Sequence, residues 1–168
     1  DGDTAICVMA AGTNYREVVG TCIGSSTLLT IPAAQPGWQE QARYVLAHER
    51  HHSAWGYHYY YLSGGSRRDL LVSLISEGAA DTFAHHLYPN QHAFWVEALT
   101  IEQEEQQWRI IQPLLDVPDR DGALHRRFFF GDEATGTPPS TGYTIGFHIL
   151  QSYWRQHPDE TVADWTCK

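Results

Sequence analysis

The chain has 168 residues, 42% of them hydrophobic, which is enough for one domain with a sizeable core and argues against disorder. Eleven lysines and arginines against twenty aspartates and glutamates give a formal net charge of −9, which argues against nucleic acid or an anionic membrane surface as a partner. No apolar run approaches the roughly 18 residues that a membrane-spanning helix needs, so we expect no membrane insertion. The sequence predicts a single α+β domain, with a small antiparallel or mixed β-sheet in residues 1–35 and mainly helices in residues 36–168.

Three short strands are predicted near the start of the chain. Residues 4–10 and 17–24 are rich in Val, Ile, Thr and Cys and flank a glycine-containing turn, which predicts two strands joined by that turn. A third strand over residues 27–31 would extend the same sheet. Cys7 and Cys22 would then face each other across the hairpin, either as a disulfide or as free thiols. The three cysteines of the chain lack C-x-x-C spacing, so they indicate no cysteine zinc site.

A helix is predicted from Trp38 to Trp55, and it contains the pattern H-E-x-x-H as His48, Glu49 and His52. Residues four apart lie about 6 Å apart on one face of a helix, so His48 and His52 could bind one Zn²⁺ through their imidazole nitrogens. Glu49 lies beside them. Its carboxylate is placed to act as a general base that takes a proton from a metal-activated water.

A second helix, predicted from about residue 68 to residue 88, carries two acids on its inward-facing apolar side. Leu70, Leu74, Glu77 and Asp81 follow spacings of four, three and four. A buried carboxylate is costly unless a cation or hydrogen bonds compensate it. Because a catalytic zinc needs a third protein ligand, we predict that Glu77 binds the metal. We predict that Asp81 accepts the free N–H of a ligating histidine and fixes its tautomer.

The rest of the chain is predicted to hold two more helices, over residues 93–112 and 142–155. Between them, residues 116–141 are rich in Gly and Pro and predict a long loop with at most a short helix near residues 124–129. Tyr143 begins the last helix. We predict that it is a catalytic residue whose hydroxyl donates to the oxyanion; the alternative is a packing residue with a hydrogen-bonded hydroxyl.

His58 is a rival third ligand, because it follows His52 by the six residues of the metzincin pattern H-E-x-x-H-x-x-G-x-x-H. Trp55 occupies the position of the required glycine. The only methionine, Met9, lies upstream, where no methionine turn can follow the motif. The sequence therefore favours Glu77 over His58. His51 projects about 100° away from its neighbour on a helix, which indicates a group that supports the ligands or is exposed.

The pair His48-Glu49, together with His52 and the helix that carries Glu77 and Asp81, resembles the gluzincins, of which thermolysin is the familiar member. A closer resemblance is to a bacterial family of predicted Zn-dependent proteases known as domain of unknown function 2268. Its further matching segments are Ser73-Leu74-Ile75-Ser76-Glu77-Gly78, Phe130-Gly131 and Thr141-Gly142-Tyr143-Thr144-Ile145-Gly146-Phe147 followed by Tyr153. The resemblance implies a zincin-like fold with an active-site helix pair, and a protease activity.

The predicted function is that of a zinc metallopeptidase with one catalytic Zn²⁺ and a peptide or protein substrate. The alternative is a catalytically silent zinc-containing module that binds peptides or regulates another protein; an intact Glu49 argues against it. A third reading has no metal and treats the two histidines as core residues paired with the acids. We expect a cytoplasmic location, with secretion as the alternative, because the chain begins without methionine and its native amino terminus is expected to be missing.

Overall fold

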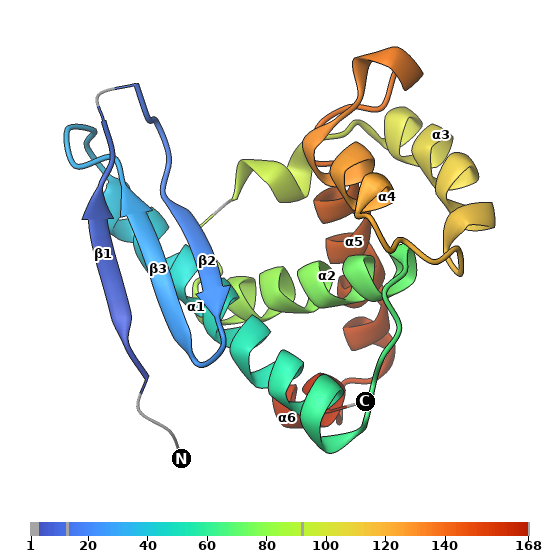
Figure 1. Cartoon of the computed structure of the whole chain (residues 1–168), viewed down its shortest axis with the longest axis horizontal. Coiled ribbons are helices and arrows are strands. Elements are labelled where there is room, and N and C mark those ends of the chain that lie inside the picture. Colours follow the sequence, from blue (N-terminus) through green and yellow to red (C-terminus); the bar gives the residue numbers. More distant parts are fainter. Residues whose placement is uncertain (1–3, 13, 92, 168) are drawn as a thin grey trace. The chain divides into compact units, whose positions relative to one another are not determined.

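The computed structural model describes residues 4–12, 14–91 and 93–167. It is mainly helical with a small three-stranded mixed sheet, so the predicted α+β class is confirmed (Figure 1). The chain forms two compact units, residues 1–65, 83–92 and 161–168, and residues 66–82 and 93–160. Helix α2 (Leu70–Leu87) contributes residues to both units. The organisation as one domain stays a prediction.

The sheet of the first unit has its last strand in the middle. Strands β1 (Ile6–Ala10), β2 (Val19–Ile23) and β3 (Ser26–Ile31) lie in the order β1-β3-β2 (Figure 1). β1 runs parallel to β3, and β2 runs antiparallel to it. Along β3 half-buried and buried residues alternate, whereas all five residues of β1 are exposed. The strand that buries most apolar surface therefore takes the central position.

The predicted hairpin between the first two strands was wrong, because β3 separates them. The hairpin joins β2 and β3 instead, through a short turn that begins at Gly24 with a φ of 61°. A positive φ is cheap only for glycine and matches the twist of a tight hairpin. Cys7 is in register with Leu28 and Cys22 with Thr27, on opposite sides of β3, and both thiols are free.

Helix α1 (Trp38–Gly56) packs against β2 and β3 and begins and ends close to the predicted bounds. Its buried face includes Tyr44 and Val45. The tyrosine-rich segment that follows is a π-helical turn, η1 (Tyr57–Leu62). Trp55 stacks on Tyr59 with ring centroids 4.8 Å apart. This aromatic contact joins the end of α1 to η1.

A short C-terminal helix, α6 (Val162–Thr166), packs against α1 within the first unit. No helix was predicted for this segment. Thr161 starts the helix with a capping box, in which its side chain and that of Asp164 each accept from the other's backbone N–H. Trp165 and Thr166 are buried, and this burial holds a helix that is too short to be stable alone.

The second unit is built around an apolar cluster of buried residues. Besides the first part of α2, its elements are η2 (Phe94–Glu97), α3 (Ile101–Ile111), η3 (Gln112–Leu114), α4 (Ala123–His125), η4 (Arg126–Phe130), η5 (Glu133–Thr135) and α5 (Thr141–Gln156). Its fully buried cluster consists of Leu70, Leu74, Ile111, Phe128, Phe129 and Ile145. The turns α4 and η4 fall where a short helix was predicted within the long loop.

The single helix predicted over residues 93–112 was wrong. It is divided into η2 and α3 by Thr100, whose backbone is extended (φ −72°, ψ 163°). The Thr100 side chain accepts from the backbone N–H of Gln103, and the Gln103 side chain accepts from the N–H of Thr100. This capping box begins a new helix and outweighs the apolar periodicity that runs across it.

Helices α2 and α5 touch through glycines. A Cβ on Gly146 would lie 2.5 Å from the carbonyl oxygen of Leu74, and a Cβ on Gly78 would overlap the carbonyl of Gly146. Only hydrogen at both positions allows the two backbones to meet. The close contact with α5 therefore holds the α2 backbone in place at Gly78, the residue directly after Glu77.

Gly146→Ala is expected to lower the free energy of unfolding by about 1–3 kcal/mol, because the new methyl meets a backbone oxygen that cannot rotate away. Denaturant unfolding of the metal-free protein measures it. Gly56→Ala is the matched control, since the nearest atom to its Cβ is Tyr60 Cδ2 at 4.0 Å. Equal effects of the two alanines would contradict the close helix crossing.

Candidate metal centre

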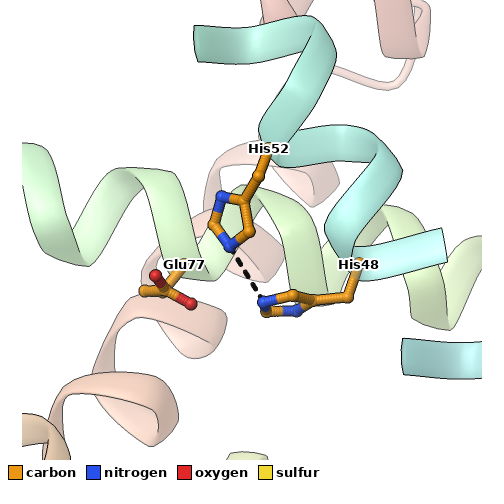
Figure 2. A group of neighbouring side chains, drawn as sticks. All are labelled: His48, His52 and Glu77. Carbon is orange, nitrogen blue, oxygen red and sulfur yellow. Dashed lines mark hydrogen bonds between the residues drawn. The ribbon is translucent and has the colours of Figure 1, made fainter. Parts of the chain in front are cut away.

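His48 and His52 lie one turn apart on α1 and turn their rings toward each other (Figure 2). Their Nε2 atoms are 2.9 Å apart, and the ring planes are 80° apart. His48 is 7% exposed. Two nitrogen ligands of a tetrahedral zinc ion, each about 2.0–2.1 Å from the metal, are about 3.3 Å from one another. The histidine pair is therefore already close to the spacing that a shared ion requires.

Glu77 completes a group that could hold a metal ion. One ligand atom from each of His48, His52 and Glu77 lies within 4.8 Å of the others (Figure 2). Two imidazoles and one carboxylate are the protein ligands of a common class of catalytic zinc site, which leaves a fourth position for water or substrate. The three residues thus fit a zinc ion, and the assignment of each as a ligand stays a prediction.

The rival ligand His58 lies on η1 and outside this group. Its Nδ1 is 3.3 Å from the hydroxyl of Ser63. The only methionine of the chain, Met9, lies in β1. The structure therefore gathers Glu77, and not His58, with the histidine pair.

The predicted general base, Glu49, is buried at 8% exposure next to strand β2. A Cβ on Gly20 of that strand would lie 2.5 Å from Glu49 Cγ and 2.6 Å from Glu49 Oε1. Gly20 thus leaves the space in which the carboxylate lies. The sequence reasoning did not single it out, although a glycine between Val19 and Thr21 in a strand is a signal of close approach.

The two variable residues of the H-E-x-x-H motif attach α1 to different segments of the first unit. Arg50 donates from Nη1 to the carbonyl oxygen of Ser25, 2.8 Å away in the turn between β2 and β3. His51 is 3% exposed and stacks on Trp165 of α6, with ring centroids 5.4 Å apart. It also contacts the ring of Phe83 at 5.6 Å. His51 is therefore buried in the core, so the exposed alternative was wrong, and a role in supporting the ligands stays a prediction.

The hydrogen bond of His51 to Thr166 indicates its tautomer. The hydroxyl of Thr166 donates to the carbonyl of Val162 at 2.6 Å, so it accepts from His51 Nε2–H at 3.1 Å. Burial, followed by the charges of His52 and His48, lowers the pKa of His51 from its ordinary 6.5 to about 3. His51 is therefore neutral near pH 7.

Asp81 is fully buried on α2, at 0% exposure. The indole Nε1–H of Trp95 donates to both of its oxygens, at 3.0 and 3.1 Å. The predicted hydrogen bond from a ligating histidine to Asp81 stays a prediction. Trp95 is a partner that the sequence did not lead us to predict; the signal was that a buried acid needs hydrogen-bond donors.

Tyr143 lies in the first turn of α5 and is half-buried against the apolar cluster of the second unit. Its ring meets that of Phe129 edge to face at 4.9 Å and that of Trp95 at 6.4 Å. Such contacts are those of a packing residue. The catalytic role of Tyr143 stays a prediction.

Residues 20–167 match the sequence model of a family described as "Predicted Zn-dependent protease (DUF2268)". The chain belongs to this family. The uncharacterized protein YjfC of Bacillus subtilis (strain 168) is 29% identical over 123 residues, which are 67% of this chain and 40% of that protein. This chain thus spans less than half of that relative's length. The search of solved structures gave no significant match.

The membership confirms the predicted family and covers both α1 and α2. In the part of the chain that the structure describes, no helix combines the length and the apolar character needed to cross a membrane.

Proposed function

We propose that this chain is a zinc-dependent metallopeptidase that hydrolyses peptide bonds, with one Zn²⁺ held by His48, His52 and Glu77. The observation that carries the proposal is the group of two histidines and a carboxylate within 4.8 Å. Membership of a family of predicted Zn-dependent proteases supports it. When bound, the zinc ion supplies Lewis acidity, which polarises a carbonyl and makes water more acidic.

Glu49 is the proposed general base. Its carboxylate takes a proton from the attacking water as the new C–O bond forms, and it returns a proton to the nitrogen as the C–N bond breaks. Its burial between α1 and Gly20 holds the carboxylate in a narrow range of positions. Tyr143 is proposed to donate its hydroxyl proton in a hydrogen bond to the oxyanion, and Asp81 to accept from a ligating histidine.

The test is zinc content followed by digestion of a peptide library. The purified protein is expected to hold one zinc per chain by elemental analysis, and the zinc-loaded protein to cleave peptides. Removal of zinc with a chelator should abolish cleavage, and added zinc should restore it. A native protein that binds no zinc would overturn the proposal.

A zinc-containing module that binds peptides without cutting them is the second candidate. Zinc binding and peptide binding without any cleavage would establish it. The presence of Glu49 argues against this candidate, because a purely structural zinc site has no use for a buried carboxylate at that position of the motif.

Gly20→Ala tests the position of the proposed base. The added methyl must displace Glu49 or Val45, because its Cβ would lie within 2.6 Å of atoms of both side chains. We expect kcat to fall roughly 10- to 100-fold, the cost of about an ångström of misplacement, with zinc content unchanged. Gly12→Ala is the control, since no described atom lies within 4 Å of its Cβ. Equal kcat for the two variants would show that β2 does not hold Glu49 in place.

A further inference from the structure

Asp81, in the second unit, is an ionisable group with 0% of its surface exposed. Both of its oxygens accept from the indole N–H of Trp95, at nearly equal distances of 3.0 and 3.1 Å. An ionised carboxylate in an apolar interior is stable only with hydrogen bonds or charges that compensate its lost hydration. Trp95 therefore supplies part of that compensation and sets the plane of the carboxylate.

Trp95 is itself held at its backbone by helix α5. The fully buried hydroxyl of Thr144 donates to the carbonyl oxygen of Trp95 at 2.9 Å and accepts from the backbone N–H of Ala98 at 3.3 Å. These two bonds tie both ends of the short turn η2 to α5. These bonds limit the movement of the Trp95 backbone, and so they limit the positions from which its indole can reach Asp81.

Trp95 also touches a second predicted site residue. Its ring contacts that of Tyr143 at 6.4 Å, with 61° between the planes. Asp81 follows Glu77 by one turn of α2, so the two carboxylates lie on the same side of that helix. Trp95, which lies on η2, therefore contacts both Asp81 on α2 and Tyr143 on α5.

We propose that Trp95 is a positioning residue of the metal centre that acts through Asp81. Its N–H holds the Asp81 carboxylate in the orientation from which that group supports the ligands, and its ring holds Tyr143. The inference rests on the proposed function, because it requires an ion at His48, His52 and Glu77. Partners of this kind typically change metal affinity 10- to 100-fold when they are lost.

Trp95→Phe tests the proposal, since phenylalanine keeps an aromatic ring and removes the N–H. The dissociation constant for zinc, measured by competition with a chromophoric chelator, is expected to rise roughly 10-fold or more. Trp108→Phe is the matched control, because Trp108 packs against the apolar cluster of the same unit, and its zinc affinity should equal that of the parent. Metal-free thermal unfolding of each variant separates a loss of fold from a loss of affinity.

A double-mutant cycle tests the route through Asp81. If Trp95 acts by orienting Asp81, then Asp81→Asn combined with Trp95→Phe should bind zinc no more weakly than Asp81→Asn alone. Trp95→His, which retains a ring N–H, should recover part of the affinity. Losses that add, or an affinity of Trp95→Phe equal to that of the parent, would overturn the proposal.

The outcomes remain distinct from those of the proposed function. A parent protein that binds no zinc overturns the metallopeptidase itself, whereas a zinc-binding parent with an unaffected Trp95→Phe overturns only the role of Trp95. Should Trp95→Phe fail to fold, Asp81→Asn decides: an affinity equal to that of the parent would remove the group through which Trp95 is proposed to act.

Discussion

Glu49→Gln is expected to reduce peptide turnover by roughly 10²- to 10⁴-fold, the usual contribution of a general base, and to leave one zinc ion bound per chain. Glutamine has nearly the same shape as glutamate and fits the same space beside Gly20, but its amide cannot take a proton from water. Zinc should remain, because the group of possible metal ligands does not include Glu49.

The measurement is single-turnover cleavage of a peptide chosen from the library digest, with zinc content determined on the same sample. Glu40→Gln is the matched control, since Glu40 lies in the first turn of the same helix with an exposed side chain paired to Arg43. Turnover in Glu49→Gln equal to that of the parent would remove Glu49 as the proposed base, whereas a parent protein that binds zinc and peptide without cleaving it would favour the binding module.

His52→Ala is expected to abolish stoichiometric zinc binding. The change removes one of two imidazole nitrogens that lie 2.9 Å apart, so the remaining histidine and Glu77 would hold the ion with one donor fewer. The loss in affinity should exceed the roughly 10- to 100-fold that the loss of a supporting group costs. Elemental analysis and chelator competition measure it.

His58→Ala is the informative control, because His58 is the ligand that the metzincin pattern would require. The variant is expected to keep its zinc, since His58 lies outside the group of His48, His52 and Glu77. Loss of zinc in His58→Ala, with zinc kept in Glu77→Ala, would reverse the choice of third ligand.

The sequence predicted what depends on local periodicity. The helix that carries His48 and His52 and the helix that carries Glu77 and Asp81 each extend over many turns with a regular apolar face, and both were located within a few residues. The sequence also contains two capping-box pairs that mark helix starts and that did not enter the prediction. They are Thr100 with Gln103 and Thr161 with Asp164. They account for the divided third helix and for the missed helix α6.

The sequence could not predict what depends on partners distant in the chain. The order of the strands depends on β3 pairing with both β1 and β2. No local pattern in residues 4–31 specifies that pairing. The bond between Trp95 and Asp81 joins residues 14 positions apart in different elements. The same holds for the space that Gly20 leaves for Glu49, which exists only once β2 lies on α1.

The contacts of Arg50 and His51 have a consequence for protein engineering. A motif written with two x positions suggests that any residues serve there, yet one of these side chains ties the helix to a hairpin turn and the other inserts against α6. Copying His48, Glu49 and His52 onto an unrelated helix would transfer the possible metal ligands and the proposed base. It would not transfer the two contacts that hold the helix in place. A transplant should therefore carry the Ser25 turn and the Trp165 ring with it, and a library that randomises both x positions should return mostly clones that bind metal poorly.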